Sequence, residues 1–146
     1  MAPSFLWSCV FRHTTLAGWI GGLMWRWRMH TDDDEMALRL HAANQQFYET
    51  VDWALDISEA DFSFYEALQG VPAGLIKRHP DKHFVMTRDG AERFLKMKYG
   101  GVWYLTAQDL LKSPLDDVVI VTGGRGDKLK ERLADAKVLK KRGILS

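Results

Sequence analysis

Apolar residues recur every three or four positions between residues 33 and 55, and this spacing predicts an amphipathic helix. The recurring positions are Met36, Leu40, Ala43, Phe47, Val51 and Ala54. Aspartates at residues 32–34 precede them. Carboxylates are favoured there because they interact with the free N–H groups of a helix start.

A second helix is predicted for residues 58–70. Ser58 and Asp61 have the spacing of a capping box, and Gly70 is a typical helix stop. Phe62, Tyr65 and Leu68 repeat at helical intervals between these signals. We therefore expect two acidic helices at the start of the domain.

The rest of the chain alternates short apolar runs with helix-like stretches. The apolar runs, each ending in threonine, are residues 83–87, 102–106 and 118–122. The helix-like stretches are residues 89–98, 107–112 and 127–142. This alternation predicts an α+β domain, or a small α/β one, with a three-stranded mixed sheet. The expected core is Phe47, Val51, Phe62, Tyr65, Leu68, Phe84, Phe94, Leu105, Leu110, Val119, Val121, Leu129 and Leu133.

Residues 1–31 are apolar and rich in tryptophan but have neither a helical nor a strand period. The clean apolar run, residues 14–25, is shorter than the about 20 residues that span a bilayer. A dispensable extension, an interfacial or buried element and a membrane anchor all stay open. We therefore divide the chain into this extension and a single domain, residues 32–146. The domain has an acidic helical part, residues 32–70, and a basic strand–helix part, residues 71–146.

Composition narrows the class of protein. The 146 residues are 47% hydrophobic, which excludes a wholly disordered chain. The single cysteine excludes a disulfide framework. The net charge of +1 conceals an uneven distribution, because residues 32–70 carry ten acids against one base, and residues 71–146 carry sixteen bases against nine acids. Such asymmetry suggests a charged partner.

A glycine-rich turn follows the last apolar run and precedes the last helix. It contains Gly123, Gly124, Arg125, Gly126 and Lys128. Backbone N–H groups in such a turn bind phosphate, and the helix start adds positive charge. Residues 118–127 resemble the strand-and-turn opening of Rossmann-like nucleotide-binding domains. A phosphate- or nucleotide-binding protein that uses this turn is one interpretation.

The last helix has a basic side that includes Lys137, Lys140 and Lys141. Lysines bind nucleic-acid phosphates by releasing counterions. Tyr99, Trp103 and Tyr104 are candidate stacking surfaces. We therefore expect a small non-enzymatic protein that binds nucleic acid through its basic half, with phosphate contacts from Arg125, Lys128, Lys137, Lys140 and Lys141.

The acidic segment offers a different interpretation. Its carboxylates would imitate the charges of a nucleic acid and dock on a basic protein partner. The candidate contacts are Asp52, Asp56, Glu59 and Asp61.

No catalytic arrangement can be recognised in the sequence, so we expect a binding protein rather than an enzyme, without a cofactor. His79, Asp81 and His83 are possible metal ligands, but Pro80 argues against the helix that would align the histidines, and no metal site is predicted. A secretory signal pattern is also lacking, because no positive charge precedes the apolar start. A cytoplasmic protein is expected, with membrane association through residues 1–31 as the alternative.

Overall fold

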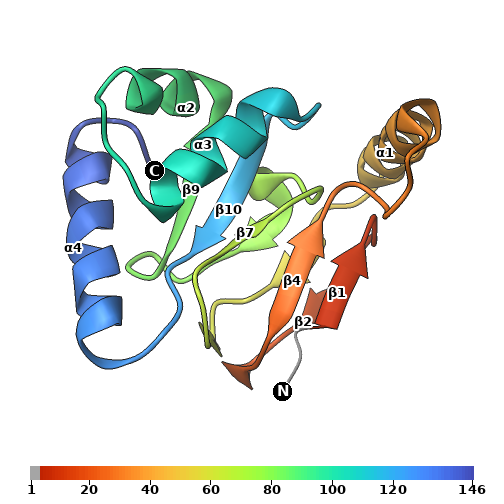
Figure 1. Ribbon diagram of the computed structural model, residues 1–146. Coiled ribbons are helices and arrows are strands. Elements are labelled where there is room, and N and C mark those ends of the chain that lie inside the picture. Colours follow the sequence, from red (N-terminus) through yellow and green to blue (C-terminus); the bar gives the residue numbers. More distant parts are fainter. Residues whose placement is uncertain (1–3) are drawn as a thin grey trace.

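Residues 4–146, the part of the chain that the computed structural model describes, form ten strands and four α-helices. Figure 1 shows their arrangement. The helices are α1 (Asp34–Tyr48), α2 (Arg88–Leu95), α3 (Val102–Lys112) and α4 (Gly126–Lys141). The first six strands are β1 (Ser4–Trp7), β2 (Thr14–Thr15), β3 (Gly18–Ile20), β4 (Leu23–Arg26), β5 (Leu55–Asp56) and β6 (Ala60–Phe62). The other four are β7 (Glu66–Leu68), β8 (Ile76–Lys77), β9 (His83–Thr87) and β10 (Asp117–Val121). The predicted mixed α+β fold is confirmed.

The centre of the fold is an antiparallel sheet in which β10 lies between β7 and β9. Val119 pairs with Leu68 on one side and with Val85 on the other. The runs at residues 83–87 and 118–122 are thus confirmed as strands. The pairing is antiparallel rather than mixed, because two helices, α2 and α3, connect β9 to β10 and return the chain in the opposite direction.

The side chains of β10 point alternately to two hydrophobic cores, one on each face of this sheet. Val119 and Val121 belong to the first core, which includes side chains from α1 and from β4–β8. Val118 and Ile120 belong to the second core, which α2, α3 and α4 cover (Figure 1). The short strands of the first half of the chain therefore form a layer opposite the three later helices.

Residues 102–106 begin α3 and do not form the strand that their apolar run predicts. Trp103, Thr106, Ala107 and Leu110 are buried at intervals of three and four residues, which is the helical period. Leu105 points the other way and is 60% exposed, so its place in the predicted core is wrong. An apolar run of this length fits a strand or a helix, and contact with the second core selects the helix.

Most of the other predicted core positions are inside. Eight are buried: Val51, Phe62, Leu68, Phe84, Phe94, Leu110, Val119 and Val121. Four are half-buried: Phe47, Tyr65, Leu129 and Leu133.

Residues 58–70 contain β6 and β7 in place of the predicted second helix. Ser58 does not cap a helix, because its N–H and its hydroxyl donate to Asp56 Oδ1 at 3.0 and 2.6 Å. In β6 the buried Ala60 and Phe62 flank the exposed Asp61, which is the strand period. The capping-box spacing is therefore misleading here.

Helix α1 begins where the sequence predicts, since the Asp33 carboxylate accepts the N–H of Met36 at 2.9 Å. It ends at Tyr48, earlier than the predicted residue 55. Val51, Ala54 and Leu55 enter the first core from the following loop and from β5. Their apolar spacing reflects burial but not a continued helix.

The tryptophan-rich segment pairs with strands from farther along the chain. In parallel pairings, β2 lies beside β5, β3 beside β6, and β1 beside β4. Trp25 is 1% exposed in the first core, with its ring centroid 6.4 Å from that of Phe62. No helix within residues 4–146 is long and apolar enough to cross a bilayer.

His83, the first residue of β9, is a buried imidazole. Its Nδ1 accepts the N–H of His79 at 3.1 Å. Burial, together with the nearby His79, Lys82 and Arg78, lowers the pKa of His83 from 6.5 to about 4. The unfolded chain therefore binds more protons than the folded chain between these two values, and stability falls as the pH falls through this window.

Replacing His83 tests this coupling. The unmodified protein is expected to lose about 3 kcal/mol of unfolding free energy through His83 between pH 7 and pH 4, since each pKa unit corresponds to about 1.4 kcal/mol. Urea unfolding at both pH values should show a smaller loss in His83→Gln, whereas His30→Gln, at an exposed position, should behave like the unmodified protein. Equal losses in all three proteins would contradict the prediction.

Candidate functional site

The glycine-rich turn after β10 is packed against the segment between β6 and β7. Gly123 has a φ of 44°, and a Cβ there would lie 1.6 Å from the carbonyl oxygen of Phe64. Gly124 donates its N–H to the carbonyl of Phe62 at 2.9 Å. Arg132 donates to the carbonyl of Gly123 at 3.0 Å. The protein's own groups therefore occupy the first half of the predicted phosphate-binding turn.

The turn also lies in a different setting from the domains it resembles. Strand β10 is antiparallel to both neighbours, whereas the nucleotide-binding turn of a Rossmann-like domain opens a parallel strand–helix–strand unit. The resemblance therefore stops at the turn and does not extend to the sheet.

The other predicted phosphate contacts are spread along α4. The Arg125 guanidinium lies 3.9 Å from the centroid of the Trp19 ring, and Gly126 begins the helix. Lys128 is exposed and lines a cavity of about 480 Å³ beside the start of α3. The remaining lysines, also exposed, are Lys137, Lys140 and Lys141. At 1.5 Å of rise per residue they lie about 14–20 Å from Lys128 along the helix axis, so the predicted residues do not form one site.

The four acidic candidates lie on strands and turns, not on the two predicted helices. They are Asp52, Asp56, Glu59 and Asp61. Asp52 accepts a hydrogen bond from His13 at 2.6 Å, and this bond lowers the pKa of Asp52. Asp61 pairs with Lys82 at 2.6 Å. Local partners therefore offset much of the negative charge that the sequence concentrates here.

A hollow that no sequence pattern indicated lies between β4, the segment after it and α3. Its volume is about 340 Å³. Its lining includes Trp7, Trp27, Arg26, Arg28, Lys112 and Asp109, and we call it the Trp–Arg hollow. Asp109 is the one acidic residue of this lining within residues 4–146. Cationic and aromatic side chains thus dominate its wall.

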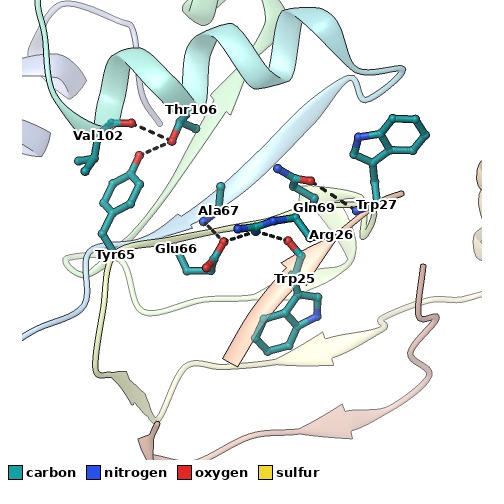
Figure 2. Close-up of polar contacts among 9 residues, drawn as sticks. All are labelled: Trp25, Arg26, Trp27, Tyr65, Glu66, Ala67, Gln69, Val102 and Thr106. Atoms are coloured by element: carbon teal, nitrogen blue, oxygen red, sulfur yellow. Dashed lines mark hydrogen bonds and ion pairs between the residues drawn. The ribbon is translucent and has the colours of Figure 1, made fainter. Parts of the chain in front are cut away.

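The aromatic rings of the Trp–Arg hollow are held from their outer sides. Trp7 is 39% exposed and stacks on Phe5, with centroids 5.1 Å apart and planes 10° apart. Trp27 packs edge-to-face on His41 at 5.7 Å. The backbone N–H of Trp27 donates to Gln69 Oε1 at 3.4 Å and holds the chain at this residue (Figure 2). The two ring contacts limit ring motion, which lowers the entropy lost when a planar ligand stacks on the tryptophans.

A smaller cavity of about 180 Å³ adjoins the first, between β4, β7 and α3, and we call it the inner hollow. The two share Arg26, Gln69 and Asp109 in their linings. Glu66 and Tyr65 line the inner hollow only. The two hollows therefore border each other at these three side chains.

Arg26 joins β4 to β7 at the border of the two cavities. Its Nη1 donates to the carbonyl of Trp25 at 2.6 Å and to Glu66 Oε1 at 2.7 Å (Figure 2). The N–H of Ala67 donates to the same carboxylate oxygen at 3.1 Å. Within residues 4–146, Nη2 and Nε of Arg26 donate no hydrogen bond, and the side chain is 28% exposed. The guanidinium therefore has donors left for an anion.

Glu66 has a buried carboxyl group, of which one oxygen accepts hydrogen bonds and the other does not. Burial raises the pKa of Glu66, against the lowering effect of Arg26. No group within residues 4–146 hydrogen-bonds to Oε2. Trp25 Nε1 and Ser63 Oγ are the only fully buried unpartnered side-chain N or O atoms in that range, so Oε2 is not completely enclosed. The carboxyl is thus an available acceptor in the inner hollow.

A chain of hydroxyl groups fixes the far side of the inner hollow. The Thr106 hydroxyl donates to the carbonyl of Val102 at 3.1 Å and lies 2.7 Å from Tyr65 Oη (Figure 2). Since Thr106 has one hydroxyl proton, Tyr65 is the donor of the second bond. Burial raises the pKa of Tyr65, so the phenol stays protonated and keeps this bond.

The residues that line both hollows come from separate segments of the chain, and no shared sequence pattern relates these segments. Arg26 stands in the tryptophan-rich start, Glu66 in a segment predicted to be helical, and Asp109 on a helix face. An arginine within an apolar segment was the one available sign, because its charge needs an acidic partner wherever the side chain is removed from water. Within residues 4–146, no cluster of three or more His, Cys, Asp or Glu residues is arranged to hold a metal ion.

Gly123→Ala should destabilise the fold by about 3 kcal/mol or more, because a Cβ would overlap the Phe64 carbonyl and the residue has a left-handed φ. Gly74→Ala is the matched control, since a Cβ there meets no atom within 4 Å. Urea unfolding of both variants measures the difference. Equal stability of the two would contradict the packing role of Gly123.

Arg26→Met should lower the unfolding free energy by about 2 kcal/mol at neutral pH, because it leaves the buried Glu66 without its cation. The loss should shrink as the pH falls, since protonation removes the unpaired charge. Arg28→Met is the control, because its partner Asp34 is exposed and such pairs contribute at most about 1 kcal/mol. Urea unfolding at neutral and mildly acidic pH measures both effects, and an equal loss in the two variants would contradict the prediction.

Comparisons of the chain with protein-family models, with curated proteins and with solved structures found no match.

Proposed function

We propose that the protein binds single-stranded nucleic acid, with the Trp–Arg hollow as the principal contact. The observation that carries the proposal is one cavity lined by two tryptophans and three cationic side chains. Single strands are bound by this combination, because bases stack on aromatic rings while cations neutralise the phosphates. A duplex keeps its bases stacked on one another and is expected to bind less tightly.

The three cations have different parts in this proposal. Arg26 has its Nη2 and Nε donors available, and Lys112 contributes an exposed ammonium from the end of α3. Arg28 already forms an ion pair with Asp34 at 2.5 Å. A phosphate at Arg28 would therefore share its positive charge with Asp34. Arg26 and Lys112 are therefore the main phosphate contacts, because their donors are not committed to an exposed acid.

The lysines of α4 add electrostatic contacts with phosphates farther along the strand. Lys137, Lys140 and Lys141 are exposed, and residues 71–146 carry a net charge of +7, from sixteen bases and nine acids. Such a surface raises the rate of encounter with a polyanion and strengthens the salt dependence of binding. It contributes no base contacts.

Two other interpretations have weaker support. In the turn at Gly123, the first backbone groups already form hydrogen bonds within the protein, such as the bond that the Gly123 carbonyl accepts from Arg132. The acidic candidates are partly paired, as Asp61 is with Lys82. Neither phosphate binding at the turn nor docking of an acidic surface explains why Trp7 and Trp27 line a cationic cavity.

Fluorescence anisotropy with labelled single strands of about 20 nucleotides tests the proposal. Trp7→Ala should weaken binding by about tenfold through lost stacking. Lys112→Gln should lower the slope of log affinity against log salt concentration by about 0.7. Lys137→Gln, Lys140→Gln and Lys141→Gln together should lower it by about 2.

The matched controls are Phe64→Ala, an exposed aromatic residue outside the hollow, and Lys96→Gln, an exposed lysine on another helix end. Both should bind like the unmodified protein. Absence of any binding at about 50 mM salt would overturn the proposal. Equal effects of Trp7→Ala and Phe64→Ala would overturn the role of the hollow.

A further inference from the structure

The two adjoining hollows differ in polarity. Arg26, Gln69 and Asp109 line both, but the Trp–Arg hollow adds the cations Arg28 and Lys112, whereas the inner hollow adds the carboxyl group of Glu66. A phosphate is favoured in the first and repelled from the second. The inner hollow instead suits a neutral group that carries several N–H donors.

We propose that the inner hollow takes up one base of the bound strand and selects guanine through Glu66, with Gln69 as the complementary donor. The inference rests on the proposed function, because the strand is held in the adjoining Trp–Arg hollow. It adds sequence preference to a contact that stacking and phosphate neutralisation alone leave nonspecific.

Glu66 provides the acceptors that guanine requires. The Watson–Crick edge of guanine carries two adjacent donors, N1–H and the N2 amine, beside the O6 acceptor. Glu66 Oε2 has no partner within residues 4–146, and Asp109 stands on the same lining. Adenine would turn the lone pair of its N1 toward these carboxyl groups and would be disfavoured.

Gln69 has its amide oriented for the third contact. Its Oε1 accepts the backbone N–H of Trp27 at 3.4 Å, so the amide NH₂ group is directed away from that bond (Figure 2). No hydrogen bond from this NH₂ group occurs within residues 4–146. Since Gln69 lines both hollows, its NH₂ group is available to donate to O6 of a base in the inner one.

The remaining walls are apolar and suit a planar ring. Met24, Val102 and Leu105 line the inner hollow away from the carboxyl groups. Leu105 is 60% exposed although it lies on a helix next to the core, and an inserted base would cover it. The Tyr65–Thr106–Val102 hydrogen bonds keep the far wall rigid, so little reorganisation is needed on binding.

The test compares labelled oligouridine strands that carry a single central guanine, inosine or adenine, measured by fluorescence anisotropy. Inosine is the informative analogue because it lacks only the N2 amine of guanine. We expect the guanine strand to bind at least about tenfold more tightly than the adenine strand, and inosine to be intermediate. Glu66→Gln should abolish the difference between the guanine and adenine strands, and Glu59→Gln, an exposed control, should retain it.

Each outcome separates the inference from the proposed function. If oligouridine binds and the three substituted strands bind equally, the base-selecting role of the inner hollow is overturned and the proposed function stands. If no strand binds, the proposed function fails and the inference fails with it. The comparison of strands on the unmodified protein decides the matter even if Glu66→Gln does not fold. A preference that persists in a folded Glu66→Gln variant would overturn the assignment to Glu66.

Discussion

Strand β10 is buried on both faces, and this constraint arranges the rest of the fold. Its neighbours β7 and β9 satisfy its backbone groups, while its side chains alternate between two hydrophobic cores. Each core needs its own cover. The helices α2, α3 and α4 cover one, and the tryptophan-rich start, through Trp25, helps to cover the other.

Polar side chains enter the interior at the boundary between these two layers. Arg26 reaches from β4 toward β7, and the buried Glu66 receives it. A buried ion pair contributes less stability than its geometry suggests, because both groups lose their hydration. Its larger consequence is chemical, since it leaves guanidinium donors and a carboxyl oxygen without partners within residues 4–146 at the border of the two hollows. Arg28 and Lys112 in one hollow and Glu66 in the other give the two their different polarities.

Little of this site was predictable from the sequence. The phosphate-binding interpretation of the turn at Gly123 depended on glycine and on charge, and glycine there serves the close approach of the Phe64 carbonyl. The basic side of α4 was predictable because the charge of an exposed helix face can be counted along the chain. Arg26 and Glu66 stand 40 residues apart in the chain, and no local pattern relates them.

By itself, the sequence determined the α+β class, the start of α1, the strands β9 and β10, and the helices α2 and α4. These elements have strong local signals, such as caps, periodic apolar faces or a run of β-branched residues. Only the tertiary structure decided that residues 58–70 contain strands, that residues 102–106 are helical, and that the two hollows exist. The physical reason is that the apolar patterns of residues 58–70 and 102–106 fit either a helix or a strand locally. Contacts with segments distant in the sequence decide which of the two forms.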